Sequence, residues 1–283
     1  MAILLTWNVA GRVGPNQERQ VAALAERAFD VLCLQEVTPR TRARWLEALE
    51  GRGLHVAVSE WPVAPSGTRR FAVLVASRRP VQPRPGPGVP WPERHLAVRT
   101  AVDCGGAGVE VEVEVHTLHA PLSSKEELGK VRTLEALHAQ LAAPADGAPR
   151  ILAGDLNTPR YESREGEIVT FARDRRARLR EELGERHDRA ELLLIDDLVR
   201  AHGWRDAFRA VHGYARRDRS WAMRTGFGWR LDHIIASPGL EPVDADYVHE
   251  WRTERLSDHS AMWARLERPT PPRTATAAPS RGA

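Results

Sequence analysis

Residues 109–115 alternate valine with glutamate at every position, a period of two that is typical of a β-strand with one buried face. The valines have odd numbers, and His119, which follows the last valine by four residues, shares their parity. We therefore expect His119 to end this strand on the buried face and His116 to point outward. A half-buried strand needs a partner layer, so the pattern predicts a sheet packed inside a larger core.

Short apolar runs predict further strands, and segments with helical spacing of apolar residues lie between them, which indicates an α/β fold. Six prolines between residues 80 and 92 predict a stiff loop, because proline cannot donate to a central strand. Residues 162–189 hold equal numbers of arginine and acidic side chains and predict a solvated helical insertion. The other strands are expected at residues 2–8, 31–35, 71–76, 150–154, 231–236 and 262–266, and the other helices at 16–28, 38–49, 123–141 and 192–202. The third of these helices is expected to begin with a capping box formed by Ser123 and Glu126.

The length of 283 residues suits one large domain, and no apolar run approaches the ~18–20 residues of a membrane span. The start of the chain, MAILLTWNVAG, lacks a basic segment, so we expect a first strand there and no secretion signal. Two cysteines exclude a disulfide scaffold and a cysteine-cluster zinc site, which favours the cytoplasm. The Pro/Thr/Ala-rich tail over residues 269–283 is expected to be disordered.

The net charge of +3 conceals a strong preference for arginine, since lysine occurs only at Lys125 and Lys130 among the 41 basic residues. Arginine suits bidentate contacts with phosphate, although a codon bias across a genome would give the same composition. The charge is therefore compatible with a polyanionic substrate without requiring one.

Polar residues follow the ends of several predicted strands. In an α/β fold such strand ends collect at one edge of a sheet, where binding and catalytic sites form. The acidic members have no lysine among them, and an oxygen-rich acidic cluster favours a hard cation such as Mg²⁺ or Mn²⁺ over zinc. The residues are Asn8, Glu36, His119, Asp155, Asn157, Asp232, Asp258 and His259.

The same residues lie in six short motifs that resemble, in content and order, the motif set of the endonuclease/exonuclease/phosphatase superfamily. The resemblance implies a four-layer α/β sandwich, in which two packed mixed β-sheets are flanked by helices and residues 1–268 form the single catalytic domain. It also implies Mg²⁺-dependent cleavage of a phosphoester by in-line attack of water. The motifs are Thr6–Asn8, Leu34–Glu36, His119, Gly154–Asn157, Arg230–Asp232 and Ser257–His259.

The resemblance assigns metal binding to three of these residues. Glu36 resembles the principal metal ligand of the family, with Asn8 and Asp258 beside the same ion. The expected cofactor is therefore Mg²⁺ or Mn²⁺.

Five further residues resemble the family's catalytic group. His259 matches the general base or phosphate-polarising histidine, and Asp232 matches the carboxylate that orients it. Asp155 and Asn157 match the pair that positions the attacking water and the phosphate oxygens. His119 holds the place of a histidine in pancreatic-deoxyribonuclease-like members and of a tyrosine in abasic-site endonucleases.

Residues 216–230 interleave arginines with aromatic side chains, which suits phosphate contact combined with base stacking. The segment is similar to the substrate side of abasic-site endonucleases of the exonuclease III type, but His119 and Val37–Thr38 depart from that subfamily. The tryptophans could equally be ordinary core residues. The substrate-binding candidates are Arg216, Arg217, Arg219, Trp221 and Trp229.

The sequence as a whole predicts a metal-dependent phosphodiesterase, a DNA endonuclease or exonuclease of repair type, that acts as a monomer without a membrane partner. One alternative is a phosphatase or phosphodiesterase acting on inositol phosphates, lipid head groups or another small ester. A catalytically silent nucleic-acid-binding module is disfavoured, because every expected catalytic position is filled.

Overall fold

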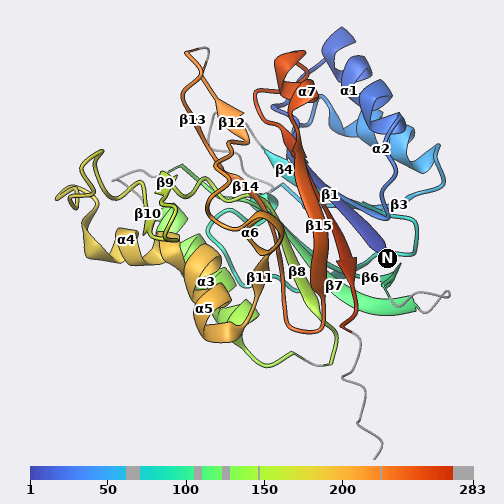
Figure 1. The fold of residues 1–283 in the computed structure, drawn as a ribbon. Helices are drawn as coiled ribbons and strands as arrows, with labels where there is room; N and C mark the ends of the chain where they lie inside the picture. Colours follow the sequence, from blue (N-terminus) through green and yellow to red (C-terminus); the bar gives the residue numbers. More distant parts are fainter. Residues whose placement is uncertain (62–70, 105–109, 123–127, 146, 224, 270–283) are drawn as a thin grey trace, which may run out of the picture.

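The computed structural model describes residues 1–61, 71–104, 110–122, 128–145, 147–223 and 225–269. Two mixed six-stranded sheets form its centre (Figure 1). The first has the order β15 (Glu241–Val248), β16 (Ala261–Glu267), β1 (Ala2–Asn8), β2 (Val31–Val37), β4 (Ala72–Ser77) and β3 (His55–Val58). The second has the order β11 (Arg205–Asp206), β14 (Asp232–Ala236), β8 (Arg150–Asp155), β7 (Glu110–His119), β6 (His95–Asp103) and β5 (Gln82–Arg84).

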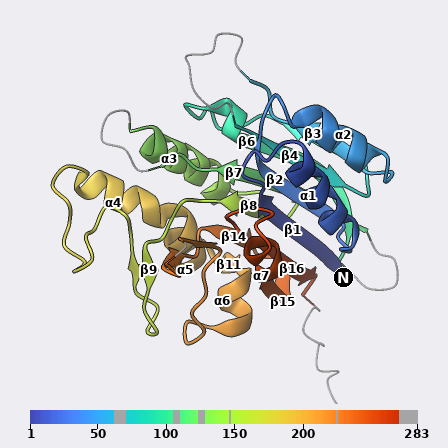
Figure 2. The same cartoon turned by 90° about the horizontal axis from the view of Figure 1, so that it is seen from above.

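Helices cover the outer face of each sheet, on opposite sides of the paired sheets (Figure 2). The first sheet is covered by α1 (Pro15–Ala25), α2 (Arg42–Glu50) and α7 (His249–Thr253). The second is covered by α3 (Gly129–Ala142), α4 (Gly184–Leu192), the π-helical segment η2 (Leu193–Asp197) and α5 (Leu198–His202). Helix α6 (Ala207–His212) packs beside β15, and the short helix η1 (Pro92–Arg94) precedes β6.

The hydrophobic side chains of the described residues form three clusters, one between the sheets and one beneath each helical layer. Strand β8 shows how the period of two serves both layers, because Ile151 and Ala153 lie between the sheets while Leu152 packs under α3. Burying both faces of each sheet gives four layers. The predicted four-layer α/β sandwich is therefore confirmed.

The prediction that His116 points outward is wrong, although Val113 and Val115 are buried between the sheets as expected. His116 lies on the face of β7 that the helical layer covers, and it is fully buried. Its Nε2 lies 2.9 Å from Glu114 Oε1, and its Nδ1 lies 3.2 Å from His95 Nε2. From Glu114 onward this face of the strand therefore meets a buried hydrogen-bonded network, whereas Glu110 and Glu112 on the same face are exposed.

The charged segment at 162–189 is not a helix before Gly184. Its first part contains the short strands β9 (Tyr161–Glu162) and β10 (Ile168–Val169) and irregular turns. Asp174 Oδ1 accepts hydrogen bonds from the backbone amides of Arg176 and Arg178, at 2.7 and 2.9 Å. Aspartate competes with helix formation in this way, so the i, i+4 spacing of charges was misleading here.

Smaller differences also have local causes. Helix α1 ends at Ala25 and helix α2 begins at Arg42, so both are shorter than expected. The capping box expected at Ser123 and Glu126, before α3, lies outside the described residues. The proline-rich segment contributes β5 as an edge strand, a place where proline is tolerated. The helix expected at 192–202 is present as the continuation of α4 through η2 and α5, and it ends at Gly203 with a φ of 70°.

None of the helices in the described ranges is long and apolar enough to cross a membrane. The tail predicted to be disordered, residues 269–283, lies outside the described residues apart from Pro269.

Candidate active site

Strand pairing within each sheet, together with the packing of the two sheets, brings five of the predicted residues to one rim. Strands β7 and β8 are parallel, and their last residues, His119 and Asp155, are register partners. Strand β14 runs antiparallel to β8, so its first residue, Asp232, pairs with Asp155. In the other sheet, β1 and β2 are parallel and end near Asn8 and Glu36. The rim is thus built from the carboxyl ends of parallel strands, where α/β folds place their sites.

Hydrogen bonds join the two sheets at this rim. Asn8 Nδ2 donates to Glu36 Oε1 at 3.2 Å and to Asp155 Oδ2 at 3.0 Å. His259 Nδ1 lies 2.8 Å from Asp232 Oδ2, while its Nε2 lies 3.8 Å from Asp155 Oδ2. The histidine is therefore oriented by Asp232 and presents its second nitrogen to the centre of the cluster.

His119 faces the same centre from β7. Its Nε2 lies 3.7 Å from Glu36 Oε1 and 3.9 Å from Asp155 Oδ2. These separations exceed hydrogen-bond distance, and a phosphate oxygen or a water molecule would fit among the three groups.

The backbone around the cluster adopts conformations that side chains seldom take. Glu36 has a φ of 59° and Asn157 a φ of 50°, both in the left-handed region. Gly154 has a φ of 144°, and a Cβ at this position would overlap the carbonyl of Leu118 on the neighbouring strand. Strained backbone of this kind clusters at functional sites, where the surrounding structure enforces it.

Two buried serines fix the loops that carry the acidic and histidine side chains. Ser257 Oγ donates to the Asn8 carbonyl at 2.6 Å and accepts from the His259 amide at 3.1 Å. Ser220 Oγ accepts from the amides of Leu231 and Asp232, at 2.9 and 3.0 Å. Because these bonds are short and buried, His259 and Asp232 are held before any ligand arrives.

The electrostatics of the cluster are unbalanced. Burial raises the pKa of Glu36, and the hydrogen bond from Asn8 offsets this only in part. Burial also raises the pKa of Asp155 against the attraction of His259. Burial alone would lower the pKa of His259, but the charges of Asp232 and Asp155 raise it, so the ring is an imidazolium. Burial lowers the pKa of His119 well below its usual value, so this ring is neutral.

The donor set fits a hard divalent cation. Asp232 Oδ1 is buried and has no hydrogen-bond partner among the described residues. Glu36 and Asp258 border one open cleft of about 700 Å³ next to the buried cluster. The oxygen of the Asn8 amide accepts from the Ala10 backbone at 2.9 Å. Carboxylate and amide oxygens with too little positive charge around them are the ligands that Mg²⁺ or Mn²⁺ prefers.

Two basic residues that the sequence reasoning missed also belong to the site. Arg94, at the end of η1, interacts electrostatically with Glu36 and Asp155. Lys130 is buried and donates to the Asn157 carbonyl at 2.7 Å and to Glu191 Oε1 at 2.6 Å. A signal for Lys130 was present, because it is one of two lysines in an arginine-rich chain and lies within the apolar stripe of a helix.

The predicted tryptophans lie on a hairpin beside the rim. Strands β12 (Trp221–Ala222) and β13 (Gly228–Trp229) form this hairpin, which projects next to α7 in Figure 1. The two indole rings stack with centroids 4.9 Å apart, and Trp221 Nε1 donates to Asp258 Oδ2 at 3.1 Å. Both tryptophans are half-buried and lie outside the three core clusters, which argues against an ordinary core role.

The three predicted arginines differ in position. Arg217 and Arg219 border a groove of about 760 Å³ together with aromatic residues of the hairpin. Arg216 instead pairs with Asp246 at 2.6 Å and with Asp218 at 3.3 Å, so its charge is already balanced by the scaffold. The basic and aromatic residues of the groove include Arg160, Arg217, Arg219, Phe227, Trp229 and Arg252.

A family model matches most of the chain. The model of the Endonuclease/Exonuclease/phosphatase family matches residues 5–259, a span that holds all six motifs. A comparison with curated protein sequences finds no match.

Solved structures share the same architecture. An AP endonuclease from Archaeoglobus fulgidus has a TM-score of 0.68 at 22% identity, over 94% of this chain and 99% of that one. The 3′ phosphatase NExo (D146N) from Neisseria, bound to a product DNA hairpin, has a TM-score of 0.64 at 21% identity, over 94% and 100%. A humanized TDP2 of D. rerio has a TM-score of 0.63 at 16% identity, over 94% and 98%. At these identities the likeness concerns the fold.

Proposed function

Because this chain belongs to the endonuclease/exonuclease/phosphatase family, whose enzymes act on phosphoester bonds, we propose that it is a Mg²⁺-dependent phosphodiesterase that cleaves DNA in repair. The observation that carries the proposal is the contrast at one rim. A buried acidic cluster with too little positive charge lies next to a half-exposed tryptophan stack and an arginine-lined groove. The first feature suits a metal and a phosphate, and the second suits a nucleic acid.

Glu36 and Asp258 would hold the cation at the cleft, and Asn8 would complete their side of the site. When bound, the cation neutralises charge on the phosphate oxygens and stabilises the departing oxygen. Asn8 also donates to Glu36 and Asp155, so it sets the orientation of two carboxylates at once. Mn²⁺ has similar ligand preferences and is the other candidate ion.

The protein's own groups then divide the remaining work. Asp155 has a raised pKa, which suits a residue that accepts a proton from the attacking water. Asn157 is fixed beside it, because the backbone N–H of Asn157 donates to Asp155 Oδ1 at 3.0 Å. His259 is an imidazolium held by Asp232, so it suits polarisation of a phosphate oxygen better than proton removal. Neutral His119 faces the same centre and would contact a phosphate oxygen or the leaving group.

The DNA preference rests on the hairpin and the groove. Exposed Phe227 and Met223 at the hairpin tip, 50% and 47% accessible, join the stacked tryptophans as surfaces for unpaired or kinked bases. Arg217 and Arg219 supply charge for the phosphates beside them. Two structural neighbours support this choice, since one is an AP endonuclease and another is a 3′ phosphatase bound to product DNA.

A panel of substrates tests the proposal. We would assay supercoiled plasmid, an abasic-site duplex, a 3′-phosphorylated duplex, an inositol phosphate and a chromogenic phosphodiester with Mg²⁺, with Mn²⁺ and with excess EDTA. We expect metal-dependent turnover of the DNA substrates above the small esters, and none from an identically purified Asp232→Asn control. Equal DNA turnover in EDTA would overturn the metal requirement, and a preference for the inositol phosphate would overturn the DNA assignment.

The setting of the enzyme is part of the same proposal. Both cysteines are free and buried, which suits a reducing compartment, and we place the protein in the cytoplasm. We propose that it works as a monomer, which light scattering during gel filtration would check.

A further inference from the structure

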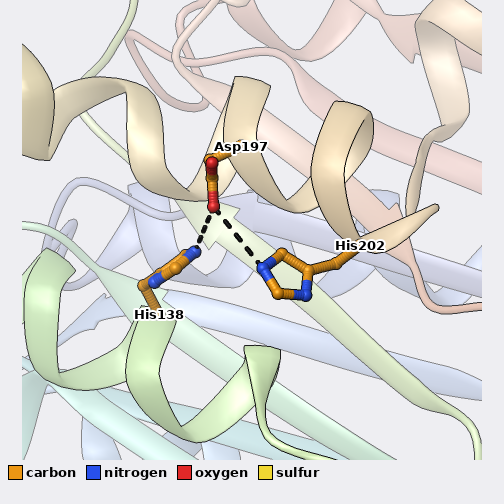
Figure 3. Close-up of side chains that lie close together, drawn as sticks. All are labelled: His138, Asp197 and His202. Carbon is orange, nitrogen blue, oxygen red and sulfur yellow. Dashed lines mark hydrogen bonds and ion pairs between the residues drawn. The ribbon is translucent and has the colours of Figure 1, made fainter.

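Three side chains of the helical layer converge on one another (Figure 3). His138 comes from α3, and Asp197 and His202 come from η2 and α5. His138 follows the active-site lysine, Lys130, by eight residues, which is about 12 Å along a helix. The cluster is therefore separate from the rim.

The two histidines share one carboxylate oxygen. His138 Nε2 lies 2.6 Å and His202 Nε2 lies 3.6 Å from Asp197 Oδ2, and the imidazole rings meet edge to face with centroids 5.6 Å apart. The neighbouring Asp196 pairs with Arg200, whereas the ion-pair partners of Asp197 among the described residues are these two histidines. Two imidazole nitrogens and one carboxylate oxygen thus face one point.

The helix geometry explains the convergence. Asp197 is the last residue of the π-helical segment, and His202 is the last residue of α5 before the turn at Gly203. A π-helical turn holds an extra residue and rotates the next helical turn relative to the preceding helix. It is after this turn that Asp197 and His202 face His138 on the neighbouring helix. Such turns occur often at functional sites.

We propose that His138, Asp197 and His202 form a Zn²⁺ site that links α3 to α5. Two imidazoles and a carboxylate are a ligand set that zinc accepts, in contrast to the oxygen-rich active site. Zinc bonds of ~2.0–2.2 Å in a tetrahedral arrangement separate neighbouring ligand atoms by about 3.3 Å. The two observed separations from Asp197 Oδ2, 2.6 and 3.6 Å, lie on either side of that value, so small side-chain movements suffice.

Exposure of the cluster leaves a place for a fourth ligand. The side chains of His138, Asp197 and His202 are 18%, 43% and 34% exposed, so water can complete the coordination from outside. The site would join two helices that otherwise contact each other through apolar side chains, and its main effect would be on stability.

Zinc titration of untagged, chelator-treated protein tests the site, with excess Mg²⁺ present to occupy the oxygen-rich rim. We expect the wild-type protein to bind one more equivalent of Zn²⁺ than the His138→Ala/His202→Ala double variant. At a Zn²⁺ concentration of 100 times Kd the wild-type Tm should rise by roughly 5 °C, and that of the double variant should not. Equal zinc uptake and equal Tm shifts in the two proteins would overturn the proposal.

Two further variants separate metal binding from folding. His55→Ala removes an exposed histidine elsewhere and should match the wild-type protein in zinc uptake. Asp197→Asn keeps the shape of the side chain, so it should fold. It removes the carboxylate ligand that both imidazoles face, so the visible absorption of bound Co²⁺ should change or be lost. If the Co²⁺ spectrum of Asp197→Asn equals that of the wild-type protein, the assignment of these ligands is wrong.

Discussion

Two buried clusters of charged residues lie on either side of Leu231, and they differ in how their negative charge is balanced. Asp232 belongs to the active-site rim, where the pKa values of Glu36 and Asp155 are raised by burial. Arg230 belongs to a second cluster in which its guanidinium lies 2.8 Å from both Glu162 and Asp206. In the second cluster both of these buried carboxylates have an arginine partner.

The carboxyl groups of the second cluster respond in the opposite way to burial. Burial would raise the pKa of Glu162, but Arg230 and Arg209 hold it at about 2. Burial would likewise raise the pKa of Asp206, but Arg230 and His233 hold it below its usual range. Similar burial therefore gives opposite shifts. The difference is an arginine within ion-pair distance of the carboxylates, because Arg94 acts on Glu36 and Asp155 only through longer-range electrostatics. A cluster whose carboxylates are each held down by a paired counter-ion is scaffold, whereas one whose positive charge leaves the pKa values of its carboxylates raised is arranged for a ligand from outside.

The largest expected effect is on activity, in the unbalanced cluster. Glu36→Gln should lower kcat by about 10³-fold or more, because it removes a charge from the proposed metal site. The Tm should stay the same or rise, because the carboxylate is costly to bury without the metal. Steady-state assays beside a melting curve check both, and Glu47→Gln on the exposed face of α2 is the control. A variant that kept its activity but lost stability would place Glu36 with the scaffold.

The two histidine variants should lose less activity than Glu36→Gln, and their losses should differ from each other. His259→Ala should lower kcat by about 10³-fold, since it removes the imidazolium and leaves Asp232 without a partner. His119→Ala should cost less, because its neutral ring makes longer contacts with the carboxylates. Single-turnover rates at saturating Mg²⁺ would measure both. Unchanged rates in both variants would contradict the assignment.

In the balanced cluster the expected effect is on stability. The pKa of Glu162 is about 2 in the folded protein against 4.5 for the free group, so its contribution is complete above pH 4.5. That contribution is lost as the pH falls from 4.5 towards 2, because the unfolded chain takes up the proton first. At neutral pH it amounts to about 3 kcal/mol.

Urea unfolding of Glu162→Gln between pH 2.5 and 7 would test this value. The variant should be less stable at pH 7 and should lose less stability than the wild-type protein on acidification. Its kcat at 25 °C should stay close to that of the wild-type protein if the fold is kept. A variant with wild-type stability and reduced kcat would reverse the distinction between the clusters.

How far the sequence could predict this arrangement depends on whether a residue's position follows from its own strand. Asn8, Glu36 and Asp155 lie at strand ends, so strand pairing within each sheet and the packing of the two sheets bring them to one rim. His116 was misplaced because its burial depends on the helical layer that covers the far face of β7. Arg216 is balanced by Asp246, thirty residues further along the chain, and no local pattern indicates that pair. Arg94 likewise reaches the site only through tertiary packing.

The tryptophan stack lies beside the active-site rim, since Trp221 contacts both Asp258 and Trp229. Trp221→Ala should weaken DNA binding by about 1–3 kcal/mol, because a ring that stacks on a base contributes about that much. The Tm should change little, because the ring lies outside the core clusters. Fluorescence anisotropy with a labelled duplex would measure the affinity. Normal binding with a lowered Tm would make Trp221 a scaffold residue.

The smallest effect concerns salt dependence and compares arginines of the two kinds within one segment. Arg217 and Arg219 border the groove, where each can meet one phosphate. Each phosphate contact on duplex DNA contributes roughly 0.9 to the slope of log affinity against log salt, so Arg217→Ala/Arg219→Ala should reduce that slope by about 2. Arg216→Ala should leave the slope nearly unchanged and should lower the Tm slightly, because Arg216 pairs with Asp246 and Asp218. Affinity at three salt concentrations distinguishes the two variants. Equal slopes in the double variant and the wild-type protein would show that the groove does not bind DNA phosphates. A reduced slope in Arg216→Ala would show that an arginine with carboxylate partners can still bind phosphate.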